Sequence, residues 1–176
     1  MLNPYILSDI IYFMISFNVK DINNFMQQLL VKETFDKFLL CECEINTSAT
    51  FHINGHVNRH FYNSEELQTI NNDFICWKNI KHICFEIIKG KKVPTKMKLI
   101  FALTKDKYSD IINSSAMVIK PEEIGGLYIH IIYENCKIEV ITGTSLNTFT
   151  MDKTLDKYWD KTVLALFNQY FVCEEN

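Results

Sequence analysis

The segment TGTSLNTFTMDK, residues 142–153, gathers hydroxyl side chains around a glycine and ends in a lysine. Hydroxyls, backbone N–H groups beside a glycine and a lysine at a helix start can together hold a phosphate. The residues that could make this contact are Thr142, Thr144, Ser145 and Lys153. A phosphate loop, however, leads its glycine straight into the helix. Nine residues separate Gly143 from Lys153, so the pattern also predicts a plain threonine-rich strand before a helix that Asp152 or Thr154 caps.

The same region continues as an alternation of aspartate and lysine. Asp152, Asp156 and Asp160 repeat every four residues, and a lysine follows each of them. On a helix this spacing forms neighbouring stripes joined by Lys-to-Asp pairs three residues apart, each worth roughly 0.2–0.5 kcal/mol. The pattern predicts a solvated helix face rather than a pair of catalytic carboxylates, with Trp159 packed into the core.

A lysine-rich segment is the strongest candidate for binding. The chain has a formal net charge of −3, but residues 78–98 hold seven lysines against Glu86 alone, a local balance of +6. We expect the following residues to contact a polyanion or an acidic partner: Lys78, Lys81, Lys89, Lys91, Lys92 and Lys96. Arg59 is the only arginine, which disfavours sequence-specific reading of DNA bases and leaves an acidic protein or a nucleic-acid backbone as the partner. The alternative is a turn that only aids solubility.

Histidines and cysteines do not have the spacing of a metal site. His52, His56 and His60 recur every four residues, but the Asn-Gly pair between them predicts a hairpin, where such positions lie about 13 Å apart. Cys41 and Cys43 could join His52 only in one particular register, so no metal is expected. The six cysteines lack a disulfide framework and predict reduced thiols in a cytoplasm.

Recognisable catalytic and cofactor motifs are absent from the sequence. It has no GxSxG, HExxH or GxGxxG pattern, so we assign no catalytic residue and no cofactor. A triad assembled from distant positions stays open. The two hypotheses are therefore a non-catalytic binding or adaptor domain, and a small enzyme that holds a phosphate-bearing substrate on residues 142–150.

The elements that position these residues follow from periodicity. The run MISFNVK predicts a strand, Asp21 caps a helix that follows it, and residues 39–58 predict two strands. A central helix ending at Lys89 fits the spacing from Trp77, although residues 83–88 could also form a buried strand.

The second half repeats this order. MKLIFALT predicts a strand and KDKYSDIINSSA a helix, and two strands flank Asn135-Cys136 as a hairpin. SLNTFTM is expected to add a third strand, and a last helix spans about residues 154–172. We expect a single α+β domain with two strand-helix-hairpin units, a central helix and a C-terminal helix on a mainly antiparallel sheet. In this order the chain is similar to a sliding-clamp domain, as an architectural analogy.

The predicted domain covers residues 14–173, and residues 1–13 form an extension outside it. That extension lacks the basic start of a signal peptide, and no run of about 20 apolar residues predicts a membrane span, so we expect a cytoplasmic protein. Edge strands of either hairpin could pair between two copies, which leaves a homodimer open.

Three stretches together resemble a family of short bacterial proteins described as a domain of unknown function. They are VKDINNFMQQLLVKETFDKFLLCECEI, WKNIKHICFEIIKGKKVPTKMKLIFAL and GTSLNTFTMDKTLDKYWD. The resemblance covers Met14 to about Phe171. It implies no activity, ligand or site residue, but it places the lysine-rich turn and the threonine-rich strand in one recurring design.

Overall fold

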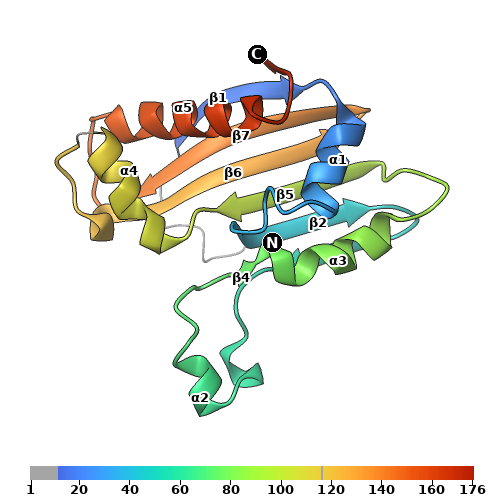
Figure 1. The fold of residues 1–176 in the computed structure, drawn as a ribbon, viewed down its shortest axis with the longest axis horizontal. Helices are drawn as coiled ribbons and strands as arrows, with labels where there is room; N and C mark the ends of the chain where they lie inside the picture. The colour runs from blue at the N-terminus through green and yellow to red at the C-terminus, as the bar shows by residue number, and fades with distance from the viewer. Residues whose placement is uncertain (1–11, 116) are drawn as a thin grey trace.

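The computed structural model describes residues 12–115 and 117–176, which form one antiparallel sheet with helices packed on a face of it (Figure 1). The strands are β1 (Tyr12–Val19), β2 (Leu39–Asn46), β3 (Thr50–Asn54), β4 (Ile75–Cys76), β5 (Lys96–Ala102), β6 (Ile124–Glu134), β7 (Lys137–Leu146) and β8 (Cys173–Glu175). The helices are α1 (Ile22–Leu30), α2 (Ser64–Leu67), α3 (Trp77–Ile88), α4 (Tyr108–Ser115) and α5 (Thr154–Asn168). The predicted α+β class is confirmed.

The two strand-helix-hairpin units are present and are joined within the sheet. The strand order is β3-β2-β5-β6-β7-β1-β8, and β4 pairs with β2. The first unit is therefore split, because β2 and β3 lie at one end of the sheet while β1 pairs with β7 near the other. Helices α1, α3, α4 and α5 lie on the same face (Figure 1).

The core lies between this face and the helices. Alternation along β5 is regular: Met97, Leu99 and Phe101 are buried, whereas Lys98 and Ile100 are partly exposed. Aromatic rings from distant elements meet under the helices. Phe17 of β1 meets Phe167 of α5 edge to face, with ring centroids 5.2 Å apart. Such pairs add about 0.5–1.5 kcal/mol beyond the area they bury.

Local signals set several boundaries as predicted. The Asp21 side chain accepts a hydrogen bond from the Asn24 backbone N–H and begins α1. Asn135 and Cys136 adopt φ values of 51° and 55°, the left-handed conformation that a two-residue hairpin turn requires. Residues 83–88 are helical, which settles the choice between helix and strand for this segment.

Two predicted elements near the C-terminus are wrong. SLNTFTM is not a separate strand: β7 continues through Leu146, and the Asn147 side chain then donates to the Glu122 carbonyl while its backbone N–H donates to the Glu123 carbonyl. These bonds hold the chain at the end of the sheet as it turns toward α5. The last helix ends at Asn168 rather than near residue 172, because residues 173–175 pair with β1 as an edge strand.

Strand β1 begins at Tyr12, two residues before the predicted start of the domain, and residues 1–11 lie outside the described part. Of the helices in the described ranges, none combines the length and the apolar character that crossing a membrane requires.

Candidate functional site

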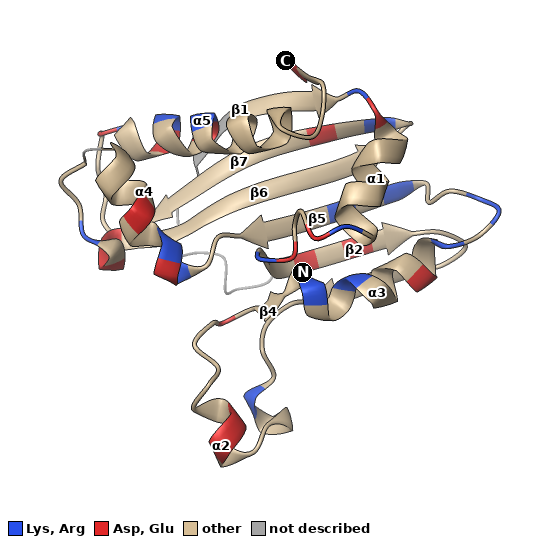
Figure 2. Cartoon of the chain, viewed as in Figure 1, with Lys and Arg blue, Asp and Glu red and all other residues tan. Residues whose placement is uncertain are grey.

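Four of the six predicted binding lysines gather along α3 and just beyond its end (Figure 2). Lys78 lies in the first turn of α3, and Lys89, Lys91 and Lys92 follow its last turn; all four are exposed. Lys89 has a partner in Glu86 at 3.5 Å, but both side chains are more than half exposed, so water screens this pair.

The structure assigns the other two lysines to ion pairs within the fold. Lys81 Nζ lies 2.6 Å from Asp36 Oδ1 and donates to the Lys32 carbonyl, and its side chain is only 16% exposed. Lys81 therefore ties α3 to the segment after α1. Lys96 lies on β5 with its Nζ 4.0 Å from Glu134 Oε1 across the strand pair. Lys81 is therefore held within the fold, whereas water screens the Lys96–Glu134 contact because these side chains are 37% and 50% exposed.

Helix α3 packs one stripe on the core and exposes two apolar side chains, Ile83 and Phe85, beside that stripe. Only Trp77 and Cys84 are buried. The Trp77 indole N–H donates to the Leu29 carbonyl at 2.8 Å, which fixes the start of the helix. We define the α3 surface by these exposed residues: Lys78, His82, Ile83, Phe85, Glu86, Lys89, Lys91, Lys92 and Val93. Its lysines carry +4 against Glu86, a formal balance of +3 on an acidic protein.

The hydroxyls predicted to hold phosphate are bonded instead to two buried aspartates of α5. Thr142 Oγ1 donates to Asp160 Oδ1 at 2.5 Å, and Thr144 Oγ1 donates to Asp156 Oδ1. All four residues are at most 8% exposed. The predicted solvated face is therefore wrong for Asp156 and Asp160, which face the sheet because α5 lies across β7 and β1. The predicted Lys-to-Asp pairing does occur once, between Lys153 and Asp156 at 3.3 Å.

This arrangement does not favour the phosphate contact. The threonine hydroxyl protons are directed to carboxylates, and two buried carboxylates would repel another anion. Burial raises the pKa of Asp160 and the neighbouring Asp156 adds to this, while the hydrogen bond from Thr142 opposes it. Ser145, on the opposite face of β7, has a buried hydroxyl with no hydrogen-bond partner among the residues described. Asp152 accepts from the Thr154 backbone N–H just before α5, but the N-cap residue is Lys153, so the predicted cap at Asp152 or Thr154 is wrong by one position.

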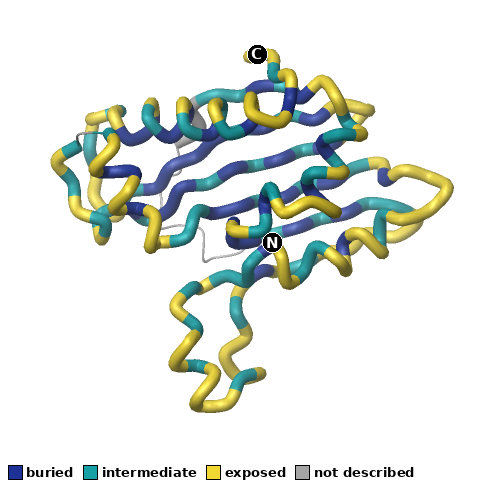
Figure 3. Tube along the Cα trace, viewed as in Figure 1, coloured by how far each residue is buried: buried dark blue, intermediate teal, exposed yellow. Residues whose placement is uncertain are grey.

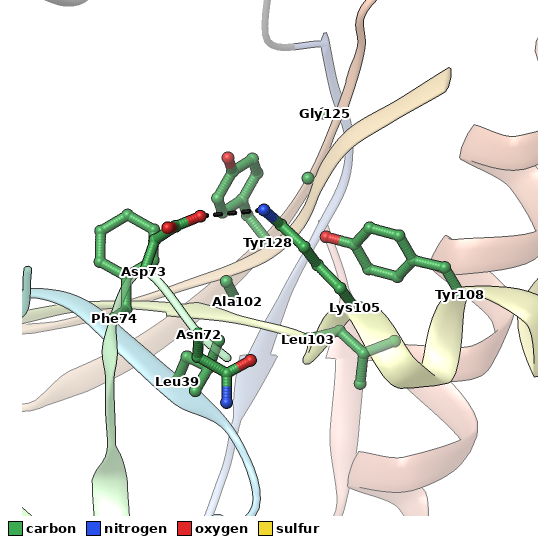
Figure 4. Close-up of a pocket in the computed structure, with 11 residues that line it drawn as sticks. Leu39, Asn72, Asp73, Phe74, Ala102, Leu103, Lys105, Tyr108, Gly125 and Tyr128 are labelled. Atoms are coloured by element: carbon green, nitrogen blue, oxygen red, sulfur yellow. Dashed lines mark hydrogen bonds and ion pairs between the residues drawn. The ribbon is translucent and has the colours of Figure 1, made fainter. Parts of the chain in front are cut away.

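Sequence reasoning missed a small pocket between the end of β5, the start of β6 and residues 72–74 (Figure 4). Lys105 reaches across it, with Nζ 2.9 Å from Asp73 Oδ2. Gly126 forms part of the wall, and a Cβ there would lie 2.2 Å from the Tyr128 hydroxyl. Burial raises the pKa of Tyr108 to about 12, so its hydroxyl keeps its proton at neutral pH. The Gly125-Gly126 pair was the only feature of the sequence that pointed to this pocket.

The pocket volume of about 70 Å³ suits a few water molecules rather than a metabolite, since ligand sites usually measure about 300–1,000 Å³. Lys105 and Asp73 neutralise one another across it. Its clearest role is mechanical, because the ion pair joins the segment after β5 to the segment before β4.

The predicted histidine and cysteine positions are dispersed. His52 contacts Glu42 at 3.1 Å, and the His56 ring packs against Phe74 with the two rings tilted by 35°. Within residues 12–115 and 117–176, no three metal-binding side chains come together. All six cysteines are free, and the buried Cys43 and Cys84 sulfurs lie 4.0 Å apart.

Comparisons with known proteins place the chain in a family without assigning it an activity. No curated protein and no solved structure matches it, so the sliding-clamp likeness stays a prediction. A model of the family of unknown function DUF5721 matches residues 28–173, which include α3, the threonine-aspartate pairs and the small pocket. Because the match covers most of the chain, this protein belongs to the DUF5721 family.

Proposed function

We propose that this protein is a non-catalytic cytoplasmic binding domain, and that it docks an acidic protein segment on the α3 surface. The observation that carries this proposal is the combination of exposed lysines and exposed apolar side chains along α3 and the turn after it. Phe85, 37% exposed, lies one helical turn before Lys89 on the same side of α3. Val93, 74% exposed, directly follows Lys91 and Lys92. Protein interfaces combine apolar contacts with a polar or charged rim. Complementary charge raises the rate of association and the selectivity between partners.

The mixed character of this surface favours a protein over a nucleic-acid backbone. A phosphate backbone is bound by charge alone and gains nothing from Ile83 or Val93. An acidic amphipathic segment would use both features, since it can place apolar residues on those side chains and carboxylates near Lys89, Lys91 or Lys92.

The hydrogen bonds of three buried or partly buried titratable groups support a non-catalytic role. Asp160 and Asp156 accept hydrogen bonds from threonines, and Lys81 is held by Asp36. Each of these groups has a partner that belongs to the fold.

Affinity capture from the protein's own cells tests the proposal at about 50 mM and about 300 mM salt, a range over which charge-driven contacts weaken strongly. The variant Lys89→Glu/Lys91→Glu/Lys92→Glu should lose an acidic partner that the unmodified protein retains at low salt. The matched control is Lys137→Glu/Lys157→Glu/Lys161→Glu, which makes the same charge change at exposed lysines elsewhere. Equal loss in both variants, or retention that ignores salt, would refute docking on the α3 surface.

A further inference from the structure

Residues 57–73 form an arm that extends away from the sheet between β3 and β4 (Figure 1). None of these residues is buried, in contrast to the central strands of the sheet (Figure 3). The base of the arm is firmly attached. The Val57 backbone N–H donates to the Asp73 carbonyl at 2.9 Å, and Lys105 holds the Asp73 carboxylate. The arm therefore projects from a fixed point.

The tip has a defined shape that comes only from local bonds. The Asn63 side chain accepts from the Glu65 and Glu66 backbone N–H groups, and Glu66 accepts in return from the Asn63 backbone. This capping box begins α2, a helix of only four residues. Phe61 is 79% exposed, and its ring stacks edge to face on Tyr62 at 5.3 Å. An ordered segment that buries no side chain has lost conformational entropy without hydrophobic compensation.

The arm and the α3 surface complement one another in charge and in apolar character. The arm contains Glu65, Glu66 and Asp73 against Arg59, a formal balance of −2. Asp73 pairs with Lys105 at the base, so the negative charge near the tip is that of Glu65 and Glu66. The α3 surface carries a formal +3 together with exposed Ile83 and Phe85. Because these side chains are exposed in the single chain, its own arm does not cover them. The arm leads through β4 directly into α3, so both features lie at the same end of the sheet (Figure 2).

We propose that the arm of one copy packs on the α3 surface of a second copy, and that the contact is reciprocal. This inference rests on the proposed function, because it names a second copy of this chain as the acidic partner. Phe61 would supply the apolar contact to Phe85, and Glu65 would face the lysines on the same side of α3. Since the donor and acceptor surfaces lie at one end of the molecule, a single two-fold axis lets both arms dock at once and closes the assembly as a dimer.

Sedimentation equilibrium of the purified chain at about 50 mM and about 300 mM salt tests the dimer. We expect a dimer at low salt whose dissociation constant rises with salt, and at least about tenfold weaker association for Phe61→Ser. Phe149→Ser is the matched control, because Phe149 is also 79% exposed but lies in the segment before α5. Circular dichroism should show that both variants stay folded.

A charge exchange gives the second test. Glu65→Lys and Lys89→Glu/Lys91→Glu/Lys92→Glu should each be monomeric alone, and their mixture should form a heterodimer because each arm then meets the opposite charge. A protein that stays monomeric up to about 200 µM, or equal effects of Phe61→Ser and Phe149→Ser, would overturn the inference. If the chain is monomeric yet captures an acidic partner through the α3 lysines, the inference fails and the proposed function stands. If neither association occurs, both fail.

Discussion

The Thr142–Asp160 hydrogen bond gives the most direct test of how α5 is held on the sheet. Replacing Thr142 by Val keeps the size and shape of the side chain but removes the hydroxyl. The change takes a donor from a buried carboxylate, and a hydrogen bond to a charged group contributes about 1.5–3 kcal/mol. It also removes the acceptor of the Ile15 backbone N–H, 3.3 Å away, which adds up to about 1 kcal/mol. We expect a total loss of about 3 kcal/mol in the free energy of unfolding at pH 7.

The loss should depend on pH in a definite direction. The pKa of Asp160 is raised in the folded protein, so this carboxyl adds stability below its unfolded pKa, about 3.9, and that stability is lost as the pH rises through the folded pKa. The hydrogen bond from Thr142 opposes the rise, so its removal raises the pKa of Asp160 further. Thr142→Val should therefore cost more above the folded pKa of Asp160, where the carboxyl is ionised, than well below it, where the carboxyl is protonated in both proteins.

Urea unfolding followed by circular dichroism at several pH values measures both effects. Thr142→Ser retains the hydroxyl and should cost less than the Val variant. Thr50→Val makes the same substitution at an exposed position of β3 and should change the free energy of unfolding by less than about 0.5 kcal/mol. A cost for Thr142→Val as small as that of Thr50→Val, with no dependence on pH, would refute the structural role assigned to the buried carboxylate.

Two further predictions concern the backbone and the thiols. Gly55→Ala should cost more than about 4 kcal/mol of unfolding free energy or prevent folding, because its Cβ would lie 1.7 Å from the Leu40 carbonyl oxygen. The control Gly90→Ala meets no atom within 4 Å and should be neutral or slightly stabilising. Equal thermal stability of the two variants would contradict this prediction. A thiol reagent should label exposed Cys136 quickly in the folded protein and reach buried Cys43 only on unfolding. Peptide mass spectra measure both rates, and rapid labelling of Cys43 would contradict its burial in the core.

Much of the fold could be predicted because its signals are local. The Asp21 cap, the apolar spacing from Trp77 and the Asn135-Cys136 turn each act over a few residues, and each lies where the sequence indicates. The predicted strand over SLNTFTM failed for a non-local reason. Its threonines suit a strand, but Asn147 is held by carbonyls more than 20 residues earlier in the chain.

The candidate site could likewise be predicted only in part. The sequence located the lysines of the α3 surface and the charge they carry. It could not distinguish Lys81 from its neighbours, because the partner Asp36 is 45 residues away in sequence. The small pocket escaped notice for the same reason, since Lys105 and Asp73 meet only after β5 and β4 are in place.

By itself, the sequence determined most of the elements, their order and the fold class, because hydrophobic periodicity and caps depend on neighbouring residues. The short strands β4 and β8 form only by pairing with β2 and β1. Only the tertiary structure decided which polar groups are buried and which are exposed. Asp156 and Asp160 have the spacing of a solvated stripe, yet they face the sheet because Thr144 and Thr142 offer hydrogen bonds there. A buried charge needs a partner, and the partner's position is set by how strands and helices pack rather than by residues beside it in the chain.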